Sequence, residues 1–182
     1  MSSSSACLTP LASLRVSRYH IPSYAGFPNT SLSPHPVVIY HRAFTPPLSS
    51  SAVSGHLRSI GVVDPQWTYP MYTQPHFHST THEVLVVLSG SARLQFGGPR
   101  NPDKVEMRVE EGDVMVLPAG VGHAMLKDEG GLMMLGCYPK GGEQWDHCTG
   151  GEEVERRIRG LGWFERDPIY GDEGPVLRGE AE

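Results

Sequence analysis

The sequence predicts an all-β protein folded as one small β-barrel, on two observations. Between residues 67 and 138, short runs rich in valine, leucine, methionine and aromatic residues follow one another, separated by glycine, proline, asparagine or aspartate. This alternation of strands and turns is typical of barrels and sandwiches. The chain has 182 residues, which suits a single domain and is enough to bury a core without disulfides.

Each element follows from the local pattern. We expect an irregular N-terminal arm over 18–35, and then a short β-branched strand over 36–41. Apolar residues at helical spacing predict one helix over 50–61 and a second, C-terminal helix over 152–160, where Thr149 and Glu152 have the spacing of a capping box. The barrel strands are expected at 67–72, 83–90, 92–98, 105–109, 113–118, 123–127 and 132–138.

Composition and charge exclude two classes of partner. Hydrophobic residues make up 38% of the chain, but no apolar run approaches the roughly 18 residues that span a bilayer, so we expect no membrane partner. Residues 1–63 carry four arginines, and all 20 acidic residues follow them. Because these arginines are scattered, without lysine clusters or interleaved aromatic residues, we expect no nucleic-acid partner.

The two ends of the chain differ from its centre. Residues 1–17 are rich in serine and lack acidic residues, which predicts a disordered leader, although a short organellar transit peptide has the same composition. We assign 18–177 to the domain with its N-terminal arm, and 178–182 to an acidic tail. The three cysteines form no CxxC pair and their number is odd, so we expect no disulfide framework and a reducing, cytoplasmic location.

The first motif that carries chemistry is HFHSTTHEVLVVLSG. Its His76 and His78 are two residues apart, so on a strand both imidazoles project to the same side. After four further residues, Glu83 opens the next strand, and after six more residues Gly90 ends it. Burying Glu83 among apolar strand residues would be costly unless the carboxylate bound a metal or were paired.

The second motif, GDVMVLPAGVGHAML, places a Pro-Gly turn just before His123. In a barrel, the strand that leaves this turn can bring His123 opposite the first strand pair. Three imidazoles and one carboxylate then converge, and such a set suits Fe(II), Mn(II), Ni(II), Cu(II) or Zn(II). We therefore predict one divalent metal ion, with Fe(II) favoured, held by His76, His78, Glu83 and His123.

Both motifs resemble the signature motifs of the cupin superfamily, with two departures. Pro70 stands where the first motif usually opens with glycine, and Lys127 where the second usually closes with asparagine. Neither position is a metal ligand. Together with YPKGGEQWD and DPIYGDEGP, the motifs are similar to YjlB-type single-domain cupins of bacteria and fungi over roughly residues 18–177. The resemblance implies a single cupin barrel of the RmlC-like jelly-roll type with a short C-terminal helix.

The resemblance also carries a functional expectation. Fungal members of similar organisation are named cupin-domain oxidoreductases and accompany polyketide synthases in pathways to salicylaldehyde-type aromatics. This implies a metal-dependent, dioxygenase-like oxidoreductase whose partner is a small oxygenated substrate, a polyketide intermediate of fungal secondary metabolism. Two alternatives stay open: a non-redox cyclase, isomerase or dehydratase at the same metal, and a non-catalytic small-ligand-binding or auxiliary protein. The resemblance and the need to cover sheet edges also predict a homodimer.

Beyond the metal ligands, the candidate catalytic residues are Tyr69, Tyr72 and Lys127. With Trp67, the two tyrosines lie on the segment that enters His76, where they line a pocket mouth or pack in the core. Lys127 faces either the pocket or solvent. Three residues at and after the end of the last strand either close the end of the barrel or pack against the C-terminal segment: Tyr138, Trp145 and Asp146.

We expect the remaining histidines not to bind the metal. His82 is adjacent to Glu83 and therefore points to the opposite face of the strand. The other five have no partner at ligand spacing and are assigned to the surface: His20, His35, His41, His56 and His147.

Overall fold

The computed structural model describes residues 5–179 and consists of two antiparallel β-sheets. The larger sheet has six strands in the order β1-β2-β7-β4-β9-β3, and the smaller has three in the order β6-β5-β8. The strands are β1 Arg15–Tyr19, β2 Val37–His41, β3 Val63–Tyr69, β4 Glu83–Ser89, β5 Ser91–Phe96, β6 Val105–Glu110, β7 Val114–Leu117, β8 His123–Asp128 and β9 Met133–Pro139.

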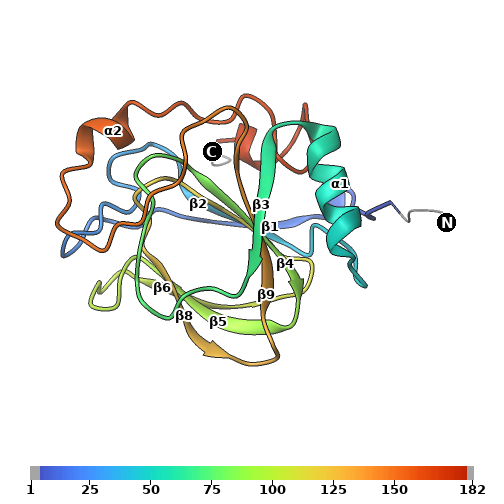
Figure 1. The fold of residues 1–182 in the computed structure, drawn as a ribbon, viewed down its shortest axis with the longest axis horizontal. Helices are drawn as coiled ribbons and strands as arrows, with labels where there is room; N and C mark the ends of the chain where they lie inside the picture. Colours follow the sequence, from blue (N-terminus) through green and yellow to red (C-terminus); the bar gives the residue numbers. More distant parts are fainter. Residues whose placement is uncertain (1–4, 180–182) are drawn as a thin grey trace.

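The two sheets face each other as a jelly-roll barrel, which confirms the predicted fold class (Figure 1). From β4 onward the chain switches repeatedly between them: β4, β7 and β9 belong to the larger sheet, and β5, β6 and β8 to the smaller. Figure 1 shows the smaller sheet at the bottom of the view and the C-terminal segment at the top. Each sheet thereby covers one apolar face of the other.

Strand β4 is buried on both faces, which explains its unbroken apolar run. Val84 and Val86 pack in an outer cluster with the first helix and the C-terminal segment. Leu85 and Val87 pack in the inner cluster with residues of the smaller sheet. Because side chains alternate along a strand, Glu83 has the same orientation as Leu85 and enters the barrel interior.

The first helix, α1 Ser50–Ile60, matches its prediction closely. The Ser49 side chain accepts the backbone N–H three residues further on, which caps the helix start. Gly61 ends the helix in the left-handed conformation, with φ of 76°. Val53 and Leu57 are the apolar face that the helical spacing predicted, and both are buried in the outer cluster.

Part of the predicted leader is structured, so the domain boundary at residue 18 is misplaced. Residues 15–17 form the first half of β1, which pairs with β2 along its whole length, and Leu8 forms a bridge with Phe44. The segment RVSRY is polar because β1 is an edge strand on which no residue is fully buried. Residues 1–4 of the leader and 180–182 of the acidic tail lie outside the described residues.

The C-terminal helix is shorter than predicted: α2 spans Glu155–Arg159. Glu152 accepts the backbone N–H groups of Thr149 and Gly150, so the expected contact forms, but in a turn that precedes the helix. Gly150 and Gly151 both have positive φ, which keeps the chain out of the helix at this point. Within residues 5–179, no helix is both long and apolar enough to cross a membrane.

Candidate metal centre

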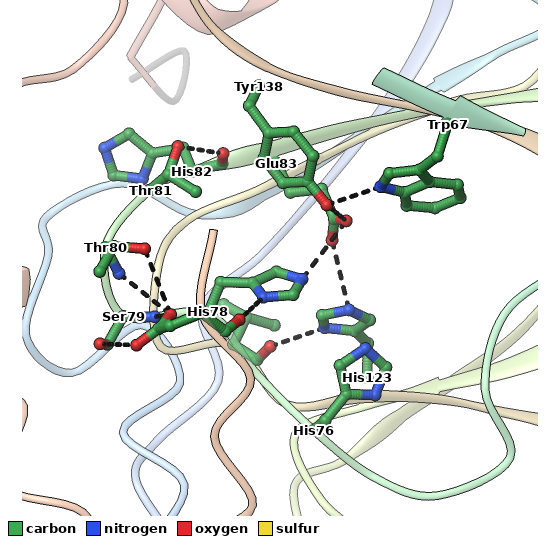
Figure 2. A network of polar contacts seen from close by, with 12 residues as sticks. Trp67, His76, His78, Ser79, Thr80, Thr81, His82, Glu83, His123 and Tyr138 are labelled. Atoms are coloured by element: carbon green, nitrogen blue, oxygen red, sulfur yellow. Dashed lines mark hydrogen bonds and ion pairs between the residues drawn. The ribbon is translucent and has the colours of Figure 1, made fainter. Parts of the chain in front are cut away.

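His76 and His78 lie on an extended segment between β3 and β4, and both rings point into the barrel (Figure 2). The backbone of His76 pairs with that of His123 through hydrogen bonds of 3.2 and 2.9 Å. Phe77, which stands between the two histidines, bridges Cys148 and buries its ring in a separate cluster. The two-residue spacing therefore places both imidazoles on one face, as the sequence predicts.

Glu83 and His123 complete the group from the two sheets. Glu83 opens β4 opposite Leu117 of β7, and His123 opens β8 opposite Phe96 of β5. The three histidines each offer one ring nitrogen, and these nitrogens lie within 4.8 Å of one another. The Glu83 carboxylate oxygens lie 3.4 Å from Nε2 of His78 and 3.2 Å from Nε2 of His123. All four side chains are buried.

A backbone carbonyl holds the Nδ1 atom of each histidine. His76 and His123 donate from Nδ1 to the carbonyl two residues before them, at 3.0 and 2.9 Å, and His78 donates to the carbonyl of Asp146. A carbonyl can only accept, so Nδ1 carries the proton and Nε2 of the neutral ring presents a lone pair. Metal-binding histidines are commonly oriented by a carbonyl in this way.

These lone pairs face an ionised carboxylate, and this arrangement is unfavourable unless positive charge lies between them. Burial lowers the pKa of His76 to about 3, mainly because the uncharged ring is favoured away from water. Burial also acts to lower the pKa of His78, but the adjacent Glu83 outweighs it and raises the pKa overall. A proton on His78 or a metal ion would each relieve the repulsion. A divalent ion would satisfy all the lone pairs at once, so the donor set fits a metal.

The two oxygens of Glu83 have different surroundings. Oε1 accepts the hydroxyl of Tyr138 at 3.0 Å, whereas Oε2 is buried and has no hydrogen-bond donor among the residues that the structure describes. Burial alone would raise the pKa of Glu83, but His78 and His123 outweigh it and hold the pKa far below its ordinary value. A buried, ionised oxygen without a donor is costly unless a cation binds it, and this oxygen therefore fits a metal ligand.

A cavity of about 250 Å³ leads outward from this group, and its outer part is formed by the half-exposed Tyr69 and Tyr72. Among the described residues that line it, Glu83 is the single carboxylate and there is no lysine or arginine. The walls are mainly aromatic and aliphatic. The lining residues are Trp67, Thr68, Tyr69, Pro70, Met71, Tyr72, His76, His78, Glu83, Leu85, His123, Met134, Tyr138, Trp145 and His147.

Asp146 holds the cavity wall beside His78, although it belongs to the segment between β9 and α2. Its carboxylate accepts the N–H of Ser79 at 2.7 Å, the Ser79 hydroxyl, and the N–H of Thr80 at 3.3 Å. Burial alone would raise the pKa of Asp146, but the hydrogen bonds from Ser79 outweigh it and lower the pKa to about 2. Trp145 and His147, the neighbours of Asp146 in the chain, both line the cavity. The hydrogen bonds of Asp146 therefore also position this part of the cavity wall.

His147 lies at the surface, as predicted, in a position beside the cavity that the sequence does not indicate. It is exposed, but it lines the cavity, and its ring stacks on that of His76 with centroids 4.8 Å apart and planes 10° apart. The ring of Tyr72 lies against it at 6.0 Å. No spacing in the sequence relates residue 147 to residue 76. The bridge between Phe77 and Cys148 brings the two segments together.

The three candidate catalytic residues fall into two groups. Tyr69 and Tyr72 lie side by side at the cavity mouth, with ring centroids 5.4 Å apart, and Trp67 lines the wall behind them. Lys127 is exposed on β8 opposite Arg93 and does not line the cavity. The β5–β8 register shifts just before this pair, so the strand alternation that would send residue 127 inward is broken.

His82 is not part of the metal group, as its position beside Glu83 predicts. It immediately precedes β4 and points away from the metal group. Its Nε2 donates to the Gly162 carbonyl at 2.9 Å, and its Nδ1 accepts the N–H of Ala119 at 3.0 Å. Its ring contacts Trp163. Both ring nitrogens are therefore used by the neutral form of the imidazole, and burial lowers the pKa of His82 to about 4.

This lowered pKa predicts a loss of stability in mild acid. An unfolded histidine takes up a proton near pH 6.5, whereas folded His82 does so only near pH 4. Between these values the unfolded chain binds more protons, so the free energy of unfolding falls as the pH falls. We expect the wild type to lose roughly 2 kcal/mol more than His82→Gln between pH 7 and pH 5. Urea unfolding with a chelator present measures this difference, and equal losses in both proteins would contradict the assignment to His82.

The fold and the site together define the class of protein: a jelly-roll barrel with three buried, convergent histidines is a cupin with a site for a metal ion. Residues 71–138 match the family model described as cupin. The chain belongs to the cupin family that includes the uncharacterized protein YjlB of Bacillus subtilis (strain 168). It is 34% identical to YjlB over 146 residues, which is 78% of this chain and 84% of YjlB. The predicted resemblance to YjlB-type cupins is confirmed, and the fungal polyketide link stays a prediction.

Parts of the solved structures of larger proteins match part of this chain. Procruciferin, an 11S globulin from Brassica napus, matches 65% of this chain with 13% identity and a TM-score of 0.37. A mutant of Bacillus subtilis oxalate decarboxylase matches 63% of it with 20% identity and a TM-score of 0.35. This chain spans about a quarter of the length of each, 24% and 27%.

Proposed function

We propose that this cupin is a metal-dependent oxidoreductase that acts on a small, flat, oxygen-bearing molecule of polyketide origin, with Fe(II) as the favoured metal. The observation that carries the proposal is the position of the ligand group: it lies at the inner end of a cavity rather than in a closed shell of protein ligands. Sites that keep coordination positions open are typical of catalytic metals, and closed sites of structural ones.

The size of the cavity supports a small substrate. A dry cavity of about 150 Å³ in another protein holds benzene. The cavity here, at about 250 Å³, therefore has room for one ring with a few substituents. The indole of Trp145 and the ring of Tyr138 are nearly parallel, with planes 17° apart, and they form one wall against which a flat ring would lie.

The charge of the lining supports a neutral or singly charged substrate. No arginine or lysine among the described lining residues would pair with a second carboxylate, and Glu83 adds a negative charge. A small dicarboxylate such as oxalate, on which oxalate decarboxylase acts, would therefore be poorly held. A molecule with two adjacent oxygens would approach the ligand group through one end, while its ring would remain among the aromatic walls.

The roles of the protein's own residues follow from these contacts. His76, His78, Glu83 and His123 would hold the ion, and the bound ion would supply Lewis-acid and oxygen-activating chemistry. Tyr69 and Tyr72 border the entrance and would exclude water once a ring is bound. The exposed ring of His147 at the cavity is the group best placed to exchange a proton between the cavity and solvent.

This proton-exchanging position favours a second candidate, a non-redox cyclase, isomerase or dehydratase. In that case the ion would polarise a substrate carbonyl, and a tyrosine or histidine at the cavity would move the proton. Such an enzyme needs no dioxygen and would work with Zn(II). The predicted homodimer would cover an edge of the larger sheet, either β1 or β3. Such a dimer is compatible with either function.

The experiment compares Fe(II)-loaded, Zn(II)-loaded and chelator-stripped protein, with catechol and 2-hydroxybenzyl alcohol as probes. We expect oxygen uptake and product formation only with the Fe(II)-loaded protein. We expect neither with the stripped protein, and no product in the absence of oxygen. Turnover with Zn(II) under anaerobic conditions would replace the proposal by the non-redox candidate. Binding of the probes without turnover under all conditions would identify a small-ligand-binding protein instead.

A further inference from the structure

We infer that Tyr138, itself held by Trp67, is a positioning residue that makes Glu83 bind the metal through one oxygen, Oε2. This inference rests on the proposed metal site and extends it to the residues behind the ligands. It concerns the way in which the carboxylate is presented, which neither the ligand spacing nor the family motifs specify.

The starting point is the difference between the two oxygens of Glu83. Oε1 accepts the Tyr138 hydroxyl at 3.0 Å, so one of its lone pairs is used by a neutral donor. Oε2 is fully buried and receives no hydrogen bond from the described residues, although Nε2 of His123 lies 3.2 Å away. Because His123 carries its proton on Nδ1, that Nε2 is a second acceptor and not a donor. Oε2 is therefore the oxygen that needs a cation.

Tyr138 is itself fixed in place from behind. Its hydroxyl oxygen accepts the indole N–H of Trp67 at 2.9 Å, which leaves the hydroxyl proton directed at Glu83 (Figure 2). The two residues come from neighbouring strands of the larger sheet, β3 and β9. The hydrogen bonds thus form a chain in which Trp67 donates to Tyr138 and Tyr138 donates to the carboxylate of Glu83.

Gly136 makes room for this chain. It lies opposite Trp67 in the β3–β9 register, and a Cβ atom at residue 136 would come within 2.0 Å of the indole ring. Any larger residue would push Trp67 out of reach of Tyr138. The absence of a side chain at this one position is therefore what lets the indole lie flat on the strand and donate to the hydroxyl.

The consequence is a carboxylate that cannot easily rotate to bind through both oxygens. Rotation toward a two-oxygen mode would break the hydrogen bond from Tyr138 and leave a buried hydroxyl without an acceptor. A ligand that uses one oxygen leaves an additional coordination position free for substrate. Outer contacts of this type typically change metal affinity by about 10- to 100-fold when they are removed.

The test uses Co(II), whose visible absorption weakens as its coordination number rises, on three variants of the full chain. Tyr138→Phe removes only the hydroxyl that contacts Glu83. Trp67→Phe keeps that hydroxyl and removes the indole donor behind it. Tyr69→Phe is the matched control, because it removes a hydroxyl from the same cavity without any contact to a metal ligand. Affinity is measured by competition with a chromophoric chelator, and the absorption spectrum is recorded at saturation.

We expect Tyr138→Phe to bind Co(II) about 10-fold more weakly and with weaker visible absorption. Trp67→Phe should show a smaller change in the same direction, roughly 2- to 5-fold in affinity. If Tyr138→Phe does not fold, the comparison of Trp67→Phe with the wild type provides the test. Tyr69→Phe should match the wild type. This inference alone would be overturned if the wild type binds Co(II) and both variants show an affinity within about 2-fold of the wild type and an unchanged absorption spectrum. A wild type that does not bind Co(II) would overturn the metal site as well.

Discussion

Replacing both His76 and His78 by alanine is expected to lower the bound metal from about one ion per chain to less than about one tenth of that. The double variant removes two of the four ligand side chains, and the two that remain, Glu83 and His123, come from opposite sheets. Two donors alone hold a divalent ion far more weakly than four. Elemental analysis of protein purified without added metal, and again after reconstitution, measures the occupancy.

The matched control is His147→Ala. This ring stacks on His76 within the same cavity but is not one of the three convergent histidines, so we expect its loss to leave the metal content unchanged. A second readout is stability. Metal at about 1,000 times its dissociation constant should stabilise the wild type and the control by about 4 kcal/mol, and the double variant by almost nothing. Equal metal content in the double variant and the wild type would place the ion elsewhere.

The second large effect concerns stability: Asp167→Ala is expected to lower the free energy of unfolding by about 4 kcal/mol. Asp167 is completely buried, and its carboxylate accepts the hydroxyl of Tyr40 at 2.6 Å and the N–H groups of Ile169, Tyr170 and Val176. Alanine would leave these four donors without an acceptor in the interior. The bond from Tyr40 also joins the C-terminal segment to β2, so its loss should loosen that segment.

Two further variants make this prediction specific. Asp167→Asn keeps the shape and one oxygen, and should lose about half as much stability. Asp172→Ala removes a carboxylate that is 88% exposed and pairs with Arg166, and should cost less than about 0.5 kcal/mol. Urea unfolding with a chelator present gives all three values. A loss below about 1 kcal/mol for Asp167→Ala would show that water replaces the missing acceptor.

Much of the fold and the ligand group could be predicted because both depend on local periodicity. Alternation along a strand placed His76 and His78 on one face and sent His82 to the other. The helix α1 and the strands β4 to β9 followed from apolar spacing and turn residues. Edge strand β1 escaped prediction because a polar strand without a fully buried face has no such alternation. For Lys127 the sequence left both the pocket and solvent open, and a register shift that local alternation does not reveal turns it to solvent.

The sequence by itself determined strands β4 to β9, which depend on apolar runs and turns between residues close together in the chain. The period of two along a strand placed His76 and His78 on one face, and the second motif identified His123 as their partner. Only the tertiary structure decided what surrounds them. Asp146 contacts residues 78–80, His147 stacks on His76, and Trp67 reaches Tyr138. These partners are 66 to 71 residues apart in the chain, and no local pattern relates them. They meet because the two sheets close on each other, and closure depends on the packing of the whole core rather than on any one segment.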